Sequence, residues 1–184
     1  MSKIKQSDKL KLIDEHFDDR FQLFLFKPTL FKLFSASGNM HNMDIKQCFR
    51  FLLLLIHGYH VYVLGDRDNN VVACALFANG RTYRYPFADQ NDLICDPCFV
   101  MPEFRRQGIA SKLLENVIDR YETEYHSIYA HIWHTNMASV LCMQKLGFEQ
   151  VGKLSTTKLT QKCIFDEKGK LILVEKKNPK NMKE

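Results

Sequence analysis

A basic, glycine-containing turn near the middle of the chain is well suited to bind an anion. Arg105, Arg106 and Gly108 follow Pro102, and a helical pattern of apolar residues begins at Ile109. The first N–H groups of a helix have no acceptor inside the helix, and the helix dipole favours a negative charge beside them. Glycine lets the backbone come close to a ligand, and the arginines add positive charge. The spacing therefore predicts a cradle for phosphate.

The same turn resembles a motif of the GNAT-family N-acetyltransferases. Residues 105–110 read Arg-Arg-Gln-Gly-Ile-Ala and fit the family pattern Q/R-x-x-G-x-G/A. Residues 136–149 resemble the family's later motif, in which an Asn opens a helix that ends in Leu-Gly-Phe. With the strand-like run 127–133 between them, the two blocks cover roughly residues 92–152. The resemblance implies a CoA thioester as acyl donor.

The resemblance also implies a set of residues that binds acetyl-CoA as cosubstrate. Backbone groups of Cys98 and Val100 hold the pantetheine chain, residues 105–111 bind the pyrophosphate, and Asn136 orients the pantetheine or a nearby water. The expected cofactor-binding residues are Cys98, Phe99, Val100, Arg105, Arg106, Gln107, Gly108, Ile109, Ala110, Ser111, Asn136, Met143 and Lys145. No metal cofactor is expected.

In this resemblance a primary amine attacks the thioester directly, so a base must first take a proton from the amine. Asp96 and His131 are the candidate bases, and Asn136 joins them in the expected catalytic set. The structural alternatives are a carboxylate bonded to backbone at a bulge and a partly buried histidine held by a neighbour. Tyr83 and Arg84 are candidate acceptor contacts, although aromatic residues flanked by arginines often just cover a core edge.

The chain departs from the family pattern at Met143, where many members carry the tyrosine that protonates the departing thiolate. A thioether cannot donate a proton. Cys142 is a weak substitute for the acid and is expected to face the core beside Leu141. Tyr129 and Tyr83 are other candidates for the acid, and the sequence does not rank these two. General acid catalysis is typically worth about 10²- to 10⁴-fold in rate. The departure leaves a second interpretation open, a non-catalytic acyl-CoA-binding module.

A Cys-x-x-Cys pair, Cys95 and Cys98, opens a third interpretation as a thiol redox or metal protein. A zinc site needs more ligands, and only His131 and His134 suggest themselves. A thioredoxin-like pair normally opens a helix, whereas this pair lies in a strand-like run. The six cysteines are scattered through apolar segments, which favours reduced, structural thiols.

The periodicity around these motifs predicts an α/β fold. The resemblance makes it GNAT-like, with a mixed, mostly antiparallel central sheet flanked by helices. The fourth strand (residues 93–100) and the fifth strand (residues 127–133) are expected to splay apart. Pro97 removes a backbone donor and predicts a bulge in the fourth strand. Helices are expected at about 44–56, from 109 and at 136–146, with a further helical piece before residue 44. Strands are expected at 21–26, 61–65, 71–77, 93–100, 127–133 and 148–154, and a hairpin at 163–165 and 170–175. The run 81–87 is expected to be a further strand or an extension of the one before it.

Composition suits a single domain over residues 1–184, with a charged segment at 1–20 and a frayed basic tail at 176–184. The net charge of +5 suits a polyanionic cofactor, and the spread of basic residues predicts no nucleic-acid partner. The apolar run 51–56 is too short to cross a membrane, and residues 1–20 lack a secretory pattern. We expect a soluble cytoplasmic enzyme that can form a homodimer. Its acceptor is an unidentified amine of a small molecule, a peptide or a protein.

Overall fold

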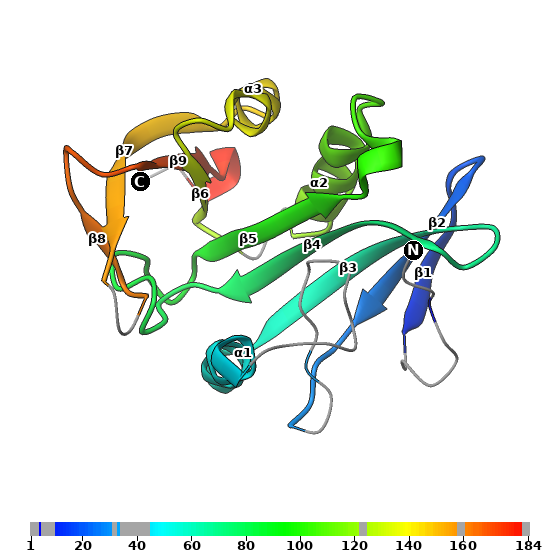
Figure 1. Ribbon diagram of the computed structural model, residues 1–184, viewed down its shortest axis with the longest axis horizontal. Coiled ribbons are helices and arrows are strands. Elements are labelled where there is room, and N and C mark those ends of the chain that lie inside the picture. Colours follow the sequence, from blue (N-terminus) through cyan, green and yellow to red (C-terminus); the bar gives the residue numbers. More distant parts are fainter. Residues whose placement is uncertain are drawn as a thin grey trace. The chain divides into compact units, whose positions relative to one another are not determined.

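The computed structural model (Figure 1) describes residues 4, 10–30, 33, 45–121, 125–157 and 161–181. The chain divides into two compact units. The first unit holds residues 1–77 and 97–117, and the second holds residues 78–96 and 118–184. Strands β4 (Val71–Asn79) and β5 (Leu93–Val100) and helix α2 (Ile109–Arg120) each contribute to both units. A single domain over the whole chain stays a prediction.

In the first unit the strand order is β1 (Lys11–Asp18), β2 (Phe21–Phe26), β3 (Tyr59–Asp66) and β4. The predicted strand at 21–26 is confirmed, and β1 pairs antiparallel to it within the segment expected only to be charged. A charged strand at a sheet edge is held by backbone pairing rather than by an apolar face, so it leaves no periodic signal.

The hairpin predicted at 61–77 is confirmed as β3 and β4. Its turn is closed by Asp66, whose Oδ1 accepts hydrogen bonds from the N–H groups of Asp68 (2.9 Å) and Asn70 (2.8 Å). Helix α1 (Ile45–His57) matches the predicted helix at 44–56. The helical piece expected before residue 44 lies mostly outside the described residues.

In the second unit the order is β5, β6 (Ser127–Trp133), β9 (Leu171–Lys177), β7 (Glu149–Thr156) and β8 (Cys163–Phe165). Strands β5 and β6 are parallel, and the other pairs are antiparallel. Helix α3 (Met137–Lys145) follows β6 as predicted. The mixed, mostly antiparallel sheet with three α-helices in the described part of the chain confirms the expected fold class.

Two strand predictions in the second unit are wrong. The runs at 163–165 and 170–175 are strands, but they do not pair with each other, because β7 lies between β8 and β9 (Figure 1). Residues 81–87 form no strand: Tyr85 N donates to Thr82 O (3.1 Å) and Gly80 N to Asp92 O (2.7 Å), which folds the loop on itself. Such local bonds compete with a strand ladder.

The basic tail is also ordered further than expected. Lys176 and Lys177 complete β9, and Asn178 is buried, with its Nδ2 donating to Tyr125 O at 2.9 Å. A 3₁₀ turn, η3 (Pro179–Asn181), follows. The predicted fraying is therefore wrong for residues 176–181, and residues 182–184 lie outside the described part.

Pairing between β5 and β6 is short. It covers Leu93–Cys95 on one strand and Ile128–Ala130 on the other, so Asp96 and His131 stand directly beyond it. Pro97 follows at once, and it has no N–H to donate.

The apolar face predicted for α2 is buried at Ile109, Leu113, Leu114, Val117 and Ile118. Among the described residues, we find no helix with the length and apolarity needed to cross a membrane.

Candidate active site

The predicted phosphate cradle lies in the first unit, where the chain leaves β5. A 3₁₀ turn, η2 (Pro102–Phe104), leads into it, and both Arg106 (φ 62°) and Gly108 (φ 75°) adopt the left-handed conformation. A helical hydrogen bond runs from Lys112 N to Gly108 O (3.1 Å), so the backbone N–H groups just before Lys112 lie in the first turn of α2. Among the described residues, and apart from Gly108 itself and its two chain neighbours, no heavy atom lies within 4 Å of the point where a Cβ of Gly108 would be. The open backbone fits a phosphate group.

Side chains of this loop are partly committed to holding its shape. Arg105 Nε donates to Val100 O (3.0 Å), and its guanidinium lies 5.6 Å from the centre of the Phe99 ring. Gln107 Nε2 donates to Glu103 O at 3.3 Å. Arg105 and Gln107 therefore fix the end of β5 and the turn after it, in addition to any contact with a ligand.

The turn between β1 and β2 holds the same loop from outside. Lys112 Nζ lies 2.9 Å from Asp18 Oδ2, and Arg20 donates to Gln107 Oε1 at 3.4 Å. The hydrogen bond from Lys112, helped by the charges of Lys112 and Arg20, outweighs burial and lowers the pKa of Asp18. Sequence reasoning missed this contact, because Asp18 and Lys112 are 94 residues apart in the chain.

The expected cofactor residues are divided between the two units. Cys98, Phe99 and Val100 are half-buried at the end of β5, and residues 105–108 are exposed. Ile109 is buried at the start of α2, and Ala110 and Ser111 are half-buried. The remaining three, Asn136, Met143 and Lys145, belong to the second unit.

The second unit brings the two predicted bases together at the end of the β5–β6 pairing. His131 Nε2 lies 3.8 Å from Asp96 Oδ1. Asp96 Oδ2 lies 3.6 Å from an Arg84 terminal nitrogen and accepts a hydrogen bond from the Tyr85 hydroxyl. The same Arg84 group is 3.4 Å from His131 Nε2. Four side chains from three chain segments thus form one polar cluster, the Asp96 cluster, in which Arg84 was predicted only as an acceptor contact.

The Asp96 cluster is nearly closed to water. The side chains of Arg84 and Asp96 are each 12% exposed, and that of His131 is 10% exposed. Burial lowers the pKa of Arg84, but the negative charges available on Tyr85, Asp96 and Cys163 outweigh it, so this pKa lies above its ordinary value. Arg84 is therefore a permanent cation within the cluster.

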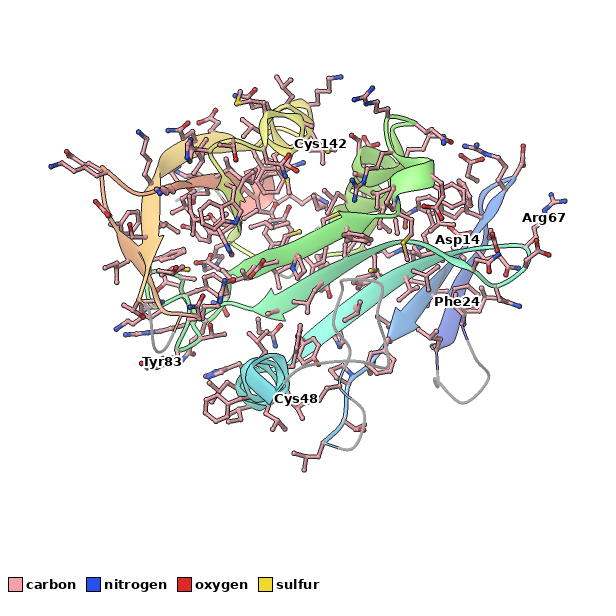
Figure 2. The ribbon with its side chains drawn as sticks, viewed as in Figure 1. Asp14, Phe24, Cys48, Arg67, Tyr83 and Cys142 are labelled. Atoms are coloured by element: carbon pink, nitrogen blue, oxygen red, sulfur yellow. The ribbon has the colours of Figure 1, made fainter. Side chains whose placement is uncertain are left out.

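Tyr85 is the member of the cluster that sequence reasoning missed. Its ring is buried and packs against the His131 ring with centroids 5.7 Å apart. Its hydroxyl accepts from Arg84 Nε (2.8 Å) and donates to Asp96, so it bridges the ion pair. Its neighbour Tyr83, labelled in Figure 2, is 50% exposed and lies under Lys162 Nζ, 5.9 Å from the ring centre. Tyr83 as an acceptor contact stays a prediction.

Tyr129, a possible general acid, belongs to a separate cluster on β6 and β9. Its hydroxyl donates to Glu175 Oε1 (3.0 Å), which also accepts from Ser127 Oγ (2.6 Å). Burial, together with the hydrogen bond to Glu175, raises the pKa of Tyr129. Tyr129 is consequently a weaker acid than an ordinary tyrosine.

Helix α3 carries the other expected site residues. The side chain of Asn136 caps the helix by accepting from Ser139 N at 3.3 Å. Met143 is buried with only 6% of its surface exposed, and Lys145 is exposed. Cys142 is half-buried (Figure 2). The position of the usual tyrosine is therefore filled by an apolar side chain packed into the fold.

Across the described residues, no group of three or more His, Cys, Asp or Glu side chains is arranged to hold a metal ion. Cys95 is buried and Cys98 half-buried, and neither forms a disulfide with another residue that the structure describes.

Comparison with known proteins gives a consistent result. Residues 25–148 match the model of the acetyltransferase (GNAT) family. No curated protein matches the chain. A GNAT family acetyltransferase from Elizabethkingia anophelis, with acetyl-CoA bound, is 15% identical with a TM-score of 0.57, covering 84% of this chain and 97% of its own.

Two further solved structures share the fold. The ribosomal-protein-S5-alanine acetyltransferase of Vibrio fischeri is 18% identical with a TM-score of 0.57, covering 87% of this chain and 94% of its own. The spermidine N-acetyltransferase of Vibrio cholerae, in complex with CoA and spermine, is 15% identical with a TM-score of 0.54, covering 88% and 97%.

Proposed function

We propose, because the chain belongs to the acetyltransferase (GNAT) family and is an acetyl-CoA-dependent acetyltransferase, that it acetylates a primary amine directly and that Asp96 and His131 form its proton-accepting site. The observation that carries the proposal is the meeting of these two side chains directly beyond the paired part of β5 and β6. Family membership favours an enzyme over a non-catalytic acyl-CoA-binding module.

The reaction needs a neutral amine. The amine nitrogen bonds to the thioester carbonyl carbon, the carbon–sulfur bond breaks, and the thiolate departs. The proton of the acceptor ammonium passes to His131 or Asp96, directly or through one water. As the amide forms, the nitrogen loses a second proton, which passes to the thiolate or to water. Holding both reactants in one site provides much of the rate advantage of such a transfer, and no covalent enzyme intermediate is required.

The cradle at residues 105–111 is the proposed pyrophosphate site. The open backbone at Gly108 and the N–H groups at the start of α2 support it, together with the positive charge of Arg105 and Arg106. Backbone groups of Cys98 and Val100 are proposed to hold the pantetheine chain, and Asn136 as a pantetheine contact stays a prediction. These assignments rest on the motif and on the shape of the loop.

The acceptor is proposed as a primary amine of a small molecule or of a peptide or protein. Among solved structures with this fold, one acetylates spermidine and another a ribosomal-protein alanine, so the fold serves acceptors of both sizes. A first amine panel should therefore contain spermidine and a peptide with an N-terminal alanine. A homodimer stays a prediction.

Turnover by Asp96→Asn and His131→Gln tests the proposal. Release of free CoA from acetyl-CoA is followed with the amine that gives the highest wild-type rate. Loss of the base is expected to lower kcat by about 10²- to 10⁴-fold, while calorimetric CoA affinity stays unchanged. Asp119→Asn, at an exposed aspartate on α2, is the matched control and should behave as wild type. Wild-type kcat in both Asp96→Asn and His131→Gln would remove these residues from the mechanism.

A further inference from the structure

A terminal nitrogen of Arg84 lies close to both proposed bases, 3.6 Å from Asp96 Oδ2 and 3.4 Å from His131 Nε2. We propose that Arg84 is a positioning residue that engages Asp96 and thereby keeps His131 neutral and able to accept a proton. The inference deepens the proposed function and rests on it in one respect, that His131 is the base. It assigns Arg84 to the control of the site rather than to the acceptor.

The first argument is the hydrogen-bond chemistry of Arg84. A guanidinium has only donors, so its contact with His131 Nε2 at 3.4 Å requires a lone pair on that nitrogen. The ring is then neutral, with its proton on Nδ1. Since His131 Nδ1 is buried, a proton that comes from the substrate amine must be taken up at Nε2. A proton already on Nε2 would set a second cation against Arg84.

The second argument is the opposing pull of Asp96. A carboxylate 3.8 Å from an imidazole nitrogen favours the imidazolium form when nothing else competes for it. Here Asp96 Oδ2 is engaged by the Arg84 guanidinium and by the Tyr85 hydroxyl. Arg84 therefore weakens the attraction between Asp96 and a protonated His131.

The third argument is the net charge of a nearly buried group. With His131 neutral, the charges of Arg84 and Asp96 cancel and the cluster carries none. Protonation of His131 would leave one uncompensated positive charge among side chains that are only 10–12% exposed. Uncompensated charge in such surroundings is costly, so the neutral imidazole is favoured.

Two neighbouring strands, β9 and β8, have contacts that are compatible with a neutral His131. On β9 the residue opposite His131 is the apolar Leu173, and Glu175 two positions away accepts bonds from Ser127 and Tyr129. On β8 the N–H of Cys163 donates to Arg84 O (2.8 Å), and the thiol acts electrostatically on Arg84. Those contacts hold Arg84 in place.

The experiment compares wild type with Arg84→Gln by two measurements. One is the pH dependence of kcat/KM, and the other is an NMR titration of the His131 ring. Without Arg84, Asp96 should pair with His131 and raise its pKa by about one unit or more. The acid limb of kcat/KM then moves to higher pH. At pH values below the acid limb, kcat/KM of Arg84→Gln should be about tenfold lower than wild type for each pH unit by which the limb moves. At pH values above the limb, kcat/KM should return towards wild type.

Two variants complete the design. Adding Asp96→Asn to Arg84→Gln removes the attracting carboxylate and should return the His131 titration towards its wild-type position. Arg81→Gln, at an exposed arginine of the same loop, is the matched control and should leave the titration unchanged. Tyr85→Phe removes one donor to Asp96 but keeps Arg84, so it should give a smaller change in the same direction and serves if Arg84→Gln does not fold.

An unchanged His131 titration in the folded variants overturns the inference, and so does an equal loss of kcat/KM at every pH. If the His131 titration moves while the acid limb of kcat/KM stays in place, the role of Arg84 stands and His131 is not the base. The two measurements therefore separate failure of this inference from failure of the proposed function.

Discussion

A charge placed at Gly108 tests the proposed cofactor site directly. Gly108 is exposed and has a left-handed backbone with φ 75°. In the part of the chain that the structure describes, no heavy atom outside Gly108 and its two chain neighbours lies within 4 Å of an added Cβ. Gly108→Asp therefore introduces a carboxylate without a steric clash, where the pyrophosphate is proposed to lie. Gly108→Asn is the matched control, because Asn has nearly the same shape and tolerates the same backbone conformation.

The magnitude follows from Coulomb's law. Two unit charges about 5 Å apart repel by about 0.8 kcal/mol in water and by about 3 kcal/mol at an effective dielectric constant of about 20. The cradle is exposed at Gly108 but is covered when a ligand fills it, so an intermediate value applies. We expect Gly108→Asp to bind CoA about 5- to 150-fold more weakly than Gly108→Asn.

Isothermal titration calorimetry with CoA and acetyl-CoA measures the difference, and thermal melting without ligand checks the fold. The unfavourable backbone conformation should cost both variants about 1 kcal/mol of folding free energy, since neither residue is glycine. Salt should reduce the difference in Kd, because surface charges are screened. Equal Kd values for the two folded variants would refute the pyrophosphate site at Gly108.

Two other residues give sharp expectations. Tyr129→Phe should leave kcat within about threefold of wild type, because its pKa is raised and its proton serves Glu175, and should cost about 1 kcal/mol in chemical denaturation; a loss of kcat above about a hundredfold would instead make Tyr129 the general acid. Asn136→Ala should lower stability by about 1 kcal/mol through loss of the α3 cap. Asn136→Ser restores the helix cap but not the side-chain amide. If the amide contacts the cofactor, both Asn136→Ala and Asn136→Ser should bind CoA more weakly than wild type. Wild-type CoA affinity in Asn136→Ser would limit Asn136 to capping.

The elements around the motifs could be predicted because their signals are local. Helix α2 has its apolar residues on one face, and α3 begins at a capping asparagine and ends in a glycine turn. Strands β3 and β4 are joined by a turn rich in Asp and Asn. Such patterns depend on neighbours within a few residues, and they predicted these elements correctly, whereas phosphate binding by residues 105–111 stays a prediction.

Pairing between distant segments could not be predicted in the same way. The run 163–165 and the run 170–175 read as a hairpin, but β7 is the partner of both strands. Edge strand β1 carries several charged residues and pairs with β2 through its backbone, so no hydrophobic periodicity predicted it. Choosing between alternative partners depends on burial across the whole sheet, which the local sequence does not contain.

The Asp96 cluster shows the same limit at the level of chemistry. Asp96 and His131 could be selected as candidate bases from residue type and from their places on neighbouring strands. The engagement of Asp96 by Arg84 and Tyr85 depends on how the 80–92 loop folds, and those residues were expected to form a strand there. An ion pair across a folded loop leaves no trace in spacing, so the sequence could suggest Arg84 only as an acceptor contact.

The balance of proton costs explains why a buried methionine at position 143 is compatible with acetyl transfer. A primary ammonium with a pKa of about 10.4 must lose its proton at pH 7, which costs about 4.6 kcal/mol. A departing thiolate with a pKa of about 8.5 lacks its proton at a cost of only about 2 kcal/mol at the same pH. The larger cost falls on the amine, where Asp96 and His131 are proposed to act, and the smaller one on the thiolate, where no acid is assigned. An enzyme with a base but without the tyrosine acid can therefore still assist the proton transfer that costs more free energy.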